Sequence, residues 1–192
     1  MIKLVVLLAA VLLGAVACGD DGTTSSEGET PVASGEVPFD RAFIDAMVPH
    51  HREAIAMAEA ASERLLSQPE LVEIANDIIS SQQLEIDQML DWREEWFGSR
   101  TLGPVEPEVL GVPEDALGME HDTAEQVANA ADVDATFAAL MIPHHEGAIA
   151  MAESATRRGQ HNELRDLAAR IIDAQEREIE VMEPHAAGEH HG

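Results

Sequence analysis

Residues 71–89, LVEIANDIISSQQLEIDQM, contain the pattern that decides the fold. Six residues follow one another there at alternating steps of four and three positions: Leu71, Ala75, Ile78, Gln82, Glu85 and Met89. Steps of this size place side chains on one narrow stripe of an α-helix, the stripe that packs against another helix. The segment therefore predicts a helix with one seam turned towards a partner.

The same seam returns in residues 164–182, LRDLAARIIDAQEREIEVM. Its matching positions are Leu164, Ala168, Ile171, Gln175, Glu178 and Met182. A second repeated segment precedes each seam, because residues 40–60 and 134–154 are identical at 12 of 21 positions. The alanine-rich composition of these segments favours a helix, and Asp40 is the expected N-cap of the first. Short turn-like stretches separate the two helices of each copy, which predicts two antiparallel helix pairs.

Two helix pairs, each with one apolar face, pack most simply as a four-helix bundle. No segment shows the alternation typical of a strand, so we expect an all-α fold built from two repeated αα-hairpins. The expected parts are a first helical-hairpin repeat at 39–97, a crossover linker at 98–131 and a second hairpin repeat at 132–185, all in one bundle domain, 39–185. The crossover has room for a short helix near 114–130, and its Met119 and His121 are within reach of the core.

The chain begins with MIKLVVLLAAVLLGAVAC, in which a lysine precedes an apolar run too short for a stable membrane span. The final four residues resemble a bacterial lipobox, with Ala15 in place of the usual leucine. We expect a lipoprotein-type signal peptide at 1–17, lipid on Cys18, and an extracytoplasmic protein anchored to the cell membrane by that lipid. The polar residues 18–38 predict a flexible linker. An uncleaved anchor or a plain secretory peptide is the alternative.

The composition excludes several classes of site and partner. Cys18 is the only cysteine, so neither an intrachain disulfide nor a thiolate metal site is expected. With 37 acidic and 11 basic residues, the formal net charge is −26. Such a chain repels nucleic acid and anionic lipid head groups and attracts cations. We therefore expect no nucleic-acid partner.

The first helix of each copy carries a second motif, MVPHHREAIAM at 47–57 and MIPHHEGAIAM at 141–151. Neighbouring helical residues point about 100° apart, so the two histidines of a pair face different directions. Each internal proline either kinks its helix or begins a new one. Imidazole and thioether together favour copper, above all Cu(I). The candidate metal ligands are Met47, His50, His51, Met57, Met141, His144, His145 and Met151.

Polar residues on the apolar seams are a further signal. Burying an unpaired carboxylate is costly, so each seam glutamate should pair with a histidine or a cation unless it escapes to solvent at a helix edge. A carboxylate that accepts an imidazole N–H commonly orients a metal-bound histidine. The additional candidates are Gln82, Glu85, Met89, Gln175, Glu178 and Met182. The His-containing tail, 186–192, and the adjacent His185 are weaker candidates.

Other metals and functions fit the pattern less well. The H-E-x-x-H signature of zinc proteases is absent, and no Glu-x-x-His pair of a di-iron centre is repeated. Glu53 matches Gly147 in the other copy, so this carboxylate is not part of the repeated design. We assign no catalytic residue and favour binding over catalysis. A redox enzyme using iron or manganese, and a metal-free structural or partner-binding bundle, stay as alternatives.

The pattern F-x-x-x-M-x-P-H-H-x-x-A-I-x-M-A followed by Q-x-x-E-I-x-x-M resembles the bacterial family known as domain of unknown function 305. The resemblance spans about residues 39–185 and includes both copies. It implies a ferritin-like four-helix bundle outside the cytoplasm. Some family members are linked to copper binding and tolerance, so the resemblance implies copper buffering, tolerance or delivery through the eight His and Met positions of the repeated motif.

Overall fold

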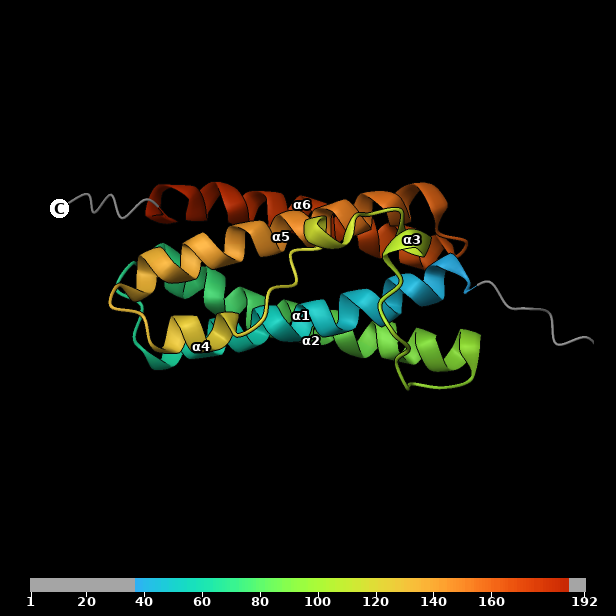
Figure 1. The fold of residues 1–192 in the computed structure, drawn as a ribbon, viewed down its shortest axis with the longest axis horizontal. Coiled ribbons are helices and arrows are strands. Elements are labelled where there is room, and N and C mark those ends of the chain that lie inside the picture. Colours follow the sequence, from blue (N-terminus) through green and yellow to red (C-terminus); the bar gives the residue numbers. More distant parts are fainter. Residues whose placement is uncertain (1–36, 187–192) are drawn as a thin grey trace, which may run out of the picture. The chain divides into compact units, whose positions relative to one another are not determined.

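Residues 37–186 are described by a computed structural model, in which they form a bundle of four long helices (Figure 1). The long helices are α1 (Phe39–Glu63), α2 (Pro69–Phe97), α5 (Val133–Arg158) and α6 (Asn162–Ala186). The expected signal peptide, Cys18, nearly all of the expected linker and the tail beyond residue 186 lie outside the described residues. Within the described part the chain has no strand, which confirms the predicted all-α bundle of two hairpins.

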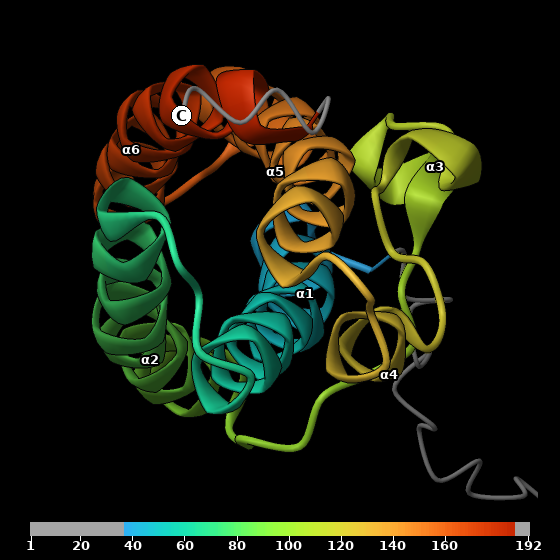
Figure 2. The same cartoon turned by 90° about the vertical axis from the view of Figure 1, so that its left-hand side faces the viewer.

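Viewed along the bundle axis, the four helices form a ring in the order α1, α2, α6, α5 (Figure 2). Short turns at 64–68 and 159–161 make α1 and α2, and likewise α5 and α6, antiparallel neighbours. The ring also makes α1 and α5 neighbours, and these are the helices that carry the histidine motifs. No helix of the described residues is both long enough and apolar enough to span a membrane.

The local sequence explains where several helices begin and end. Pro69 is the first residue of α2, a position where its missing N–H costs no helical hydrogen bond. Gly98 ends the same helix with a φ of 76°, in the left-handed region that glycine enters without strain. Pro49 and Pro143 lie inside the continuous helices α1 and α5, so the alternative in which each proline begins a new helix is wrong.

The crossover between the hairpins packs over α1 and α5 on one side of the bundle (Figure 2). It contains α3 (Pro107–Leu110), the 3-10 turn η1 (Glu114–Ala116) and α4 (Thr123–Ala128). Instead of one helix near 114–130 the chain thus forms two short helical pieces there, joined by the irregular segment 117–122. Met119 packs half-buried against the core, whereas His121 is exposed.

Two repeat-related aspartates tie each hairpin to the other. Asp40 is not the N-cap of α1, because Pro38 holds that position. Its carboxylate instead accepts the backbone N–H of His161, in the turn between α5 and α6, at 2.9 Å. Asp134, the equivalent residue of the second copy, accepts the N–H of Ser67 in the turn between α1 and α2 at 3.0 Å. The first helix of each hairpin therefore fixes the turn of the other.

We expect the substitution Asp40→Asn to lower the free energy of unfolding by about 2 kcal/mol, because it removes a buried charged acceptor of backbone N–H groups. Asp40 is only 1% exposed. Urea unfolding of the full chain, followed by circular dichroism, measures the change. The control is Glu59→Gln on the exposed face of α1, where a change within about 0.5 kcal/mol is expected. Equal unfolding midpoints for the two variants would contradict this role of Asp40.

Candidate metal centre

Four histidines from the two copies of the motif meet between α1 and α5. The ring centroids of His50 and His144 are 3.7 Å apart. The rings of His51 and His145 each lie 6.4 Å from that of their neighbour in the sequence. His144 is 2% exposed and the other three are fully buried. The two histidine pairs therefore form one group, called here the histidine cluster, rather than two separate sites.

A glutamate of the adjacent seam holds each outer histidine of the cluster. His51 Nε2 lies 2.8 Å from Glu85 Oε2, and His145 Nε2 lies 2.7 Å from Glu178 Oε2. Because an ionised carboxylate only accepts hydrogen bonds, Nε2 of each ring is the donor and Nδ1 of the neutral ring keeps its lone pair. Histidine, one of the partners expected for the seam glutamates, is therefore the one found, and the contact leaves Nδ1 of each outer ring buried without a hydrogen-bond partner.

Six ring nitrogens of the cluster are buried without a hydrogen-bond partner. They are Nδ1 and Nε2 of both His50 and His144, and Nδ1 of both His51 and His145. Leaving a buried polar atom unpaired costs about 1–3 kcal/mol, so most buried polar groups in proteins have partners. Ring nitrogens that carry a lone pair satisfy this requirement by binding a metal ion. The cluster therefore has the donor chemistry of a cation site.

The same burial keeps the central rings neutral. Burial lowers the pKa of His50 well below its usual value, and repulsion by the other histidines of the cluster lowers it further, whereas the nearby backbone of Leu117 acts in the opposite direction. Burial also lowers the pKa of His144, an effect partly opposed by Glu53. The Glu53 carboxylate lies 3.8 Å from His144 Nε2, too far for a hydrogen bond. Neutral imidazole is the form that binds metals.

The histidine cluster divides the buried core into two apolar groups, and each group contains three methionines. One holds Met47, Met89 and Met151, and the other holds Met57, Met141 and Met182. All six are fully buried. The repeat relates Met47 to Met141, Met57 to Met151 and Met89 to Met182, so each group contains one methionine of every pair. Thioether sulfur is therefore present in both apolar groups. Gln82 and Gln175 are also buried, each with its Oε1 unpartnered.

Within residues 37–186, no three or more His, Cys, Asp or Glu side chains are already arranged as a metal site. Hard-metal centres such as those of di-iron proteins are built from carboxylates and histidines in such groups. Methionine thioethers are not among those donors. Histidine is one of the donors in these groups, so the finding applies to the histidine cluster as well as to the carboxylates, and only thioether sulfur lies outside it.

The two copies differ where the crossover meets the histidine cluster. A Cβ at Gly147 would lie 2.1 Å from the carbonyl oxygen of Leu117, so only glycine lets the crossover backbone pack onto α5 beside His144. Glu53, at the equivalent position of α1, accepts a hydrogen bond from Thr123 Oγ1 at 3.1 Å. Sequence reasoning missed these roles, although the break in the repeat at this position was the available signal.

Comparisons with known proteins agree with the fold and the motif. The family model described as Domain of unknown function (DUF305) matches residues 40–185. CopM in its Cu(I)-bound form is 33% identical, with a TM-score of 0.62 over 78% of this chain and 96% of CopM. CopM has also been solved in Cu(II)-bound and silver-bound forms.

Two further solved structures have the same fold. A DUF305 fragment from Deinococcus radiodurans is 27% identical, with a TM-score of 0.64 over 79% of this chain and 97% of that one. A DUF305 protein from Streptomyces coelicolor is 23% identical, with a TM-score of 0.68 over 76% of this chain and 90% of that one. No curated protein matches the chain.

Proposed function

The chain belongs to the DUF305 family, and from its histidine cluster we propose that it is an extracytoplasmic protein that binds copper as cargo. The observation that carries the proposal is the set of six buried ring nitrogens without hydrogen-bond partners. The copper-bound and silver-bound structures of CopM support a copper-linked role for this fold at 33% identity. Buffering, tolerance or delivery are the functions that such binding serves.

In this proposal, different residues of the chain bind copper and orient its ligands. The four histidines offer imidazole nitrogens, and Glu85 and Glu178 hold the outer rings through Nε2, which leaves Nδ1 without a hydrogen-bond partner. The buried methionines of the two apolar groups offer thioether sulfur, the softest donor in the described residues. Imidazole with thioether suits Cu(I) better than it suits a hard cation such as iron(III) or manganese(II).

The location outside the cytoplasm rests on the sequence. The signal peptide at 1–17 and the lipid on Cys18 are part of the proposal, and both lie outside the described residues. A chain with a formal net charge of −26 over its full sequence attracts cations from its surroundings. Such a position suits a protein that intercepts copper near the membrane.

Elemental analysis of the full chain, purified from the cell-envelope fraction of its host, tests both parts of the proposal. We expect the protein in that fraction, with copper in stoichiometric amount after growth in copper-containing medium. Iron or manganese in place of copper would favour the redox-enzyme alternative. A metal-free protein that takes up no copper on addition would favour a structural bundle, and recovery from the cytosol would refute the location.

A further inference from the structure

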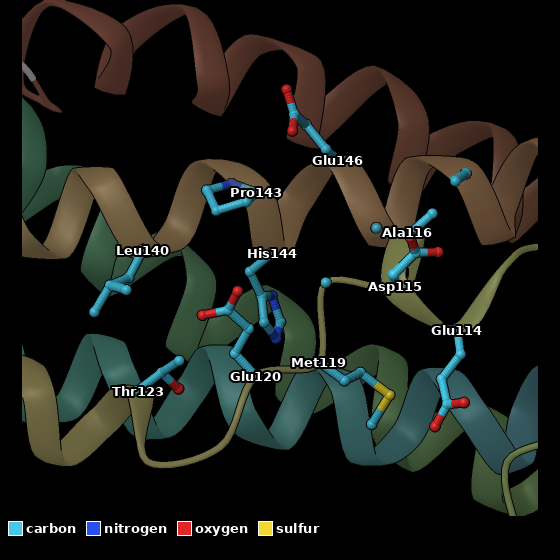
Figure 3. A pocket seen from close by; sticks show the side chains of 13 residues that line it. Glu114, Asp115, Ala116, Met119, Glu120, Thr123, Leu140, Pro143, His144 and Glu146 are labelled. Carbon is cyan, nitrogen blue, oxygen red and sulfur yellow. The ribbon is translucent and has the colours of Figure 1, made fainter.

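A cavity of about 440 Å³ lies between α5 and the crossover (Figure 3). Its walls come from η1, the irregular segment 117–122, the start of α4 and one face of α5. Glu114, Asp115 and Glu120 line it and are exposed, so the cavity reaches the molecular surface. His144 of the histidine cluster also lines it, so the same cavity reaches the cluster.

A cation bound by the histidine cluster needs a path through the surrounding protein. Three of the four rings have no exposed surface at all, and His144 retains 2%. The two outer rings are covered on their Nε2 side by Glu85 and Glu178. His144 has both ring nitrogens unpartnered, and it is the cluster member that lines the cavity. This ring is therefore the point at which an incoming ion can first meet the cluster.

The chemistry of the cavity wall suits a soft cation. Four carboxylates line it, those of Glu114, Asp115, Glu120 and Glu146, and none of the lining residues is lysine or arginine. A cleft lined by charges of one sign raises the local concentration of counter-ions and their association rate. Met119 adds a thioether, and Figure 3 shows its side chain on the same side of α5 as the His144 ring.

We propose that this cavity is the entrance through which a soft monovalent cation, Cu(I) or Ag(I), reaches the histidine cluster. The exposed carboxylates concentrate the ion, the Met119 thioether binds it first, and His144 takes it into the bundle. The inference rests on the proposed copper binding and adds the route and the residues that serve it. None of these entrance residues other than His144 belongs to the cluster itself.

A groove of about 360 Å³ between α2 and α6 is the competing route. It too is acidic, lined by Glu70, Glu73 and Asp77, but Arg177 places a positive charge in it. Its only contact with the cluster is Glu178, whose carboxylate is hydrogen-bonded to the outer ring of His145. This groove therefore offers a matched control, because the same number of carboxylates can be neutralised there.

The test measures association of Ag(I) with the full chain by stopped-flow ultraviolet absorbance in nitrate buffer of low ionic strength. The cavity variant is E114Q/D115N/E120Q, and the groove variant is E70Q/E73Q/D77N; each removes three negative charges. We expect association with the cavity variant to be slower by about tenfold, and with the groove variant by less than about twofold. High salt should abolish the difference, because it screens exposed charges.

Substitution Met119→Leu tests the thioether without changing charge. We expect it to slow both uptake and release severalfold while leaving the equilibrium affinity unchanged, because Met119 lies on the route and not in the cluster. Equal rates for the cavity and groove variants, or a larger loss in the groove variant, would overturn the entrance while leaving copper binding intact. A wild-type chain that binds neither Ag(I) nor Cu(I) at equilibrium would instead overturn the proposed function.

Discussion

Replacing His50 and His144 together by alanine is expected to weaken Cu(I) binding by about a thousandfold, or about 4 kcal/mol. These two rings lie 3.7 Å apart at the centre of the cluster and hold four of its six unpartnered nitrogens. Because burial lowers the pKa of both rings, they are neutral and bind the ion without first losing a proton. The double substitution therefore removes two imidazole ligands that are ready to bind. Competition with a chromophoric Cu(I) chelator under anaerobic, reducing conditions gives the affinity of each variant.

The control for this experiment removes two histidines that lie outside the cluster, in the double variant H121A/H185A. We expect its Cu(I) affinity to remain within about twofold of wild type, well under the 1.4 kcal/mol that a tenfold change requires. Substitution of Glu85 by Gln should weaken Cu(I) binding by about 10–100-fold, which is less than in H50A/H144A and more than in the control. It loosens the orientation of His51 but removes no imidazole ligand. Full affinity in H50A/H144A together with loss in the control would place the copper at the surface of the bundle.

Placing a methyl group at Gly147 is expected to lower the free energy of unfolding by about 3 kcal/mol, near the upper range for overpacking. The new Cβ would lie 2.1 Å from the oxygen and 2.3 Å from the carbon of the Leu117 carbonyl, and 2.6 Å from the nitrogen of Gly118. These are backbone atoms, which cannot turn aside as the end of a flexible side chain can. The clash outweighs the gain of about 1 kcal/mol that alanine brings to a helix.

Thermal and urea unfolding of the full-length variant Gly147→Ala measure this loss. The neighbouring exposed substitution Glu146→Ala serves as the control, with an expected change within about 0.5 kcal/mol. Limited proteolysis adds a second readout, because a displaced segment 117–122 should become sensitive to cleavage. A Gly147→Ala protein as stable and as protected as wild type would show that the crossover does not press on α5.

The helices and their pairing could be predicted from the sequence because their causes are local. Seam positions such as Leu71 and Ile78 report a helix by spacing alone, and a short turn makes two helices antiparallel. The cost of burying a lone carboxylate indicated a histidine or a cation as the partner of Glu85, and the partner is His51, although the Glu85 side chain keeps 21% of its surface exposed. In each case the physical reason lies within one hairpin.

What could not be predicted depends on how the two hairpins meet. The repeat does not specify the order of helices around the ring, so the approach of His50 to His144 could not be derived from spacing. Asp40 was misinterpreted for the same reason, because its partner lies in a turn more than a hundred residues further along the chain. Local capping rules favour the nearest N–H groups, but here tertiary contacts with the turn provided the partners.

The reciprocal contacts of Asp40 and Asp134 have a consequence for the symmetry of the molecule. Each half contacts the other through the same residue, which is the geometry of an isologous homodimer with a two-fold axis. The chain is thus organised as the two halves of a dimer joined in one polypeptide, and the two closest rings of the histidine cluster, His50 and His144, come one from each half. A single ion bound between these two rings would lie between the two halves. The crossover, together with Glu53 on α1 and Gly147 at the equivalent position of α5, distinguishes one half from the other.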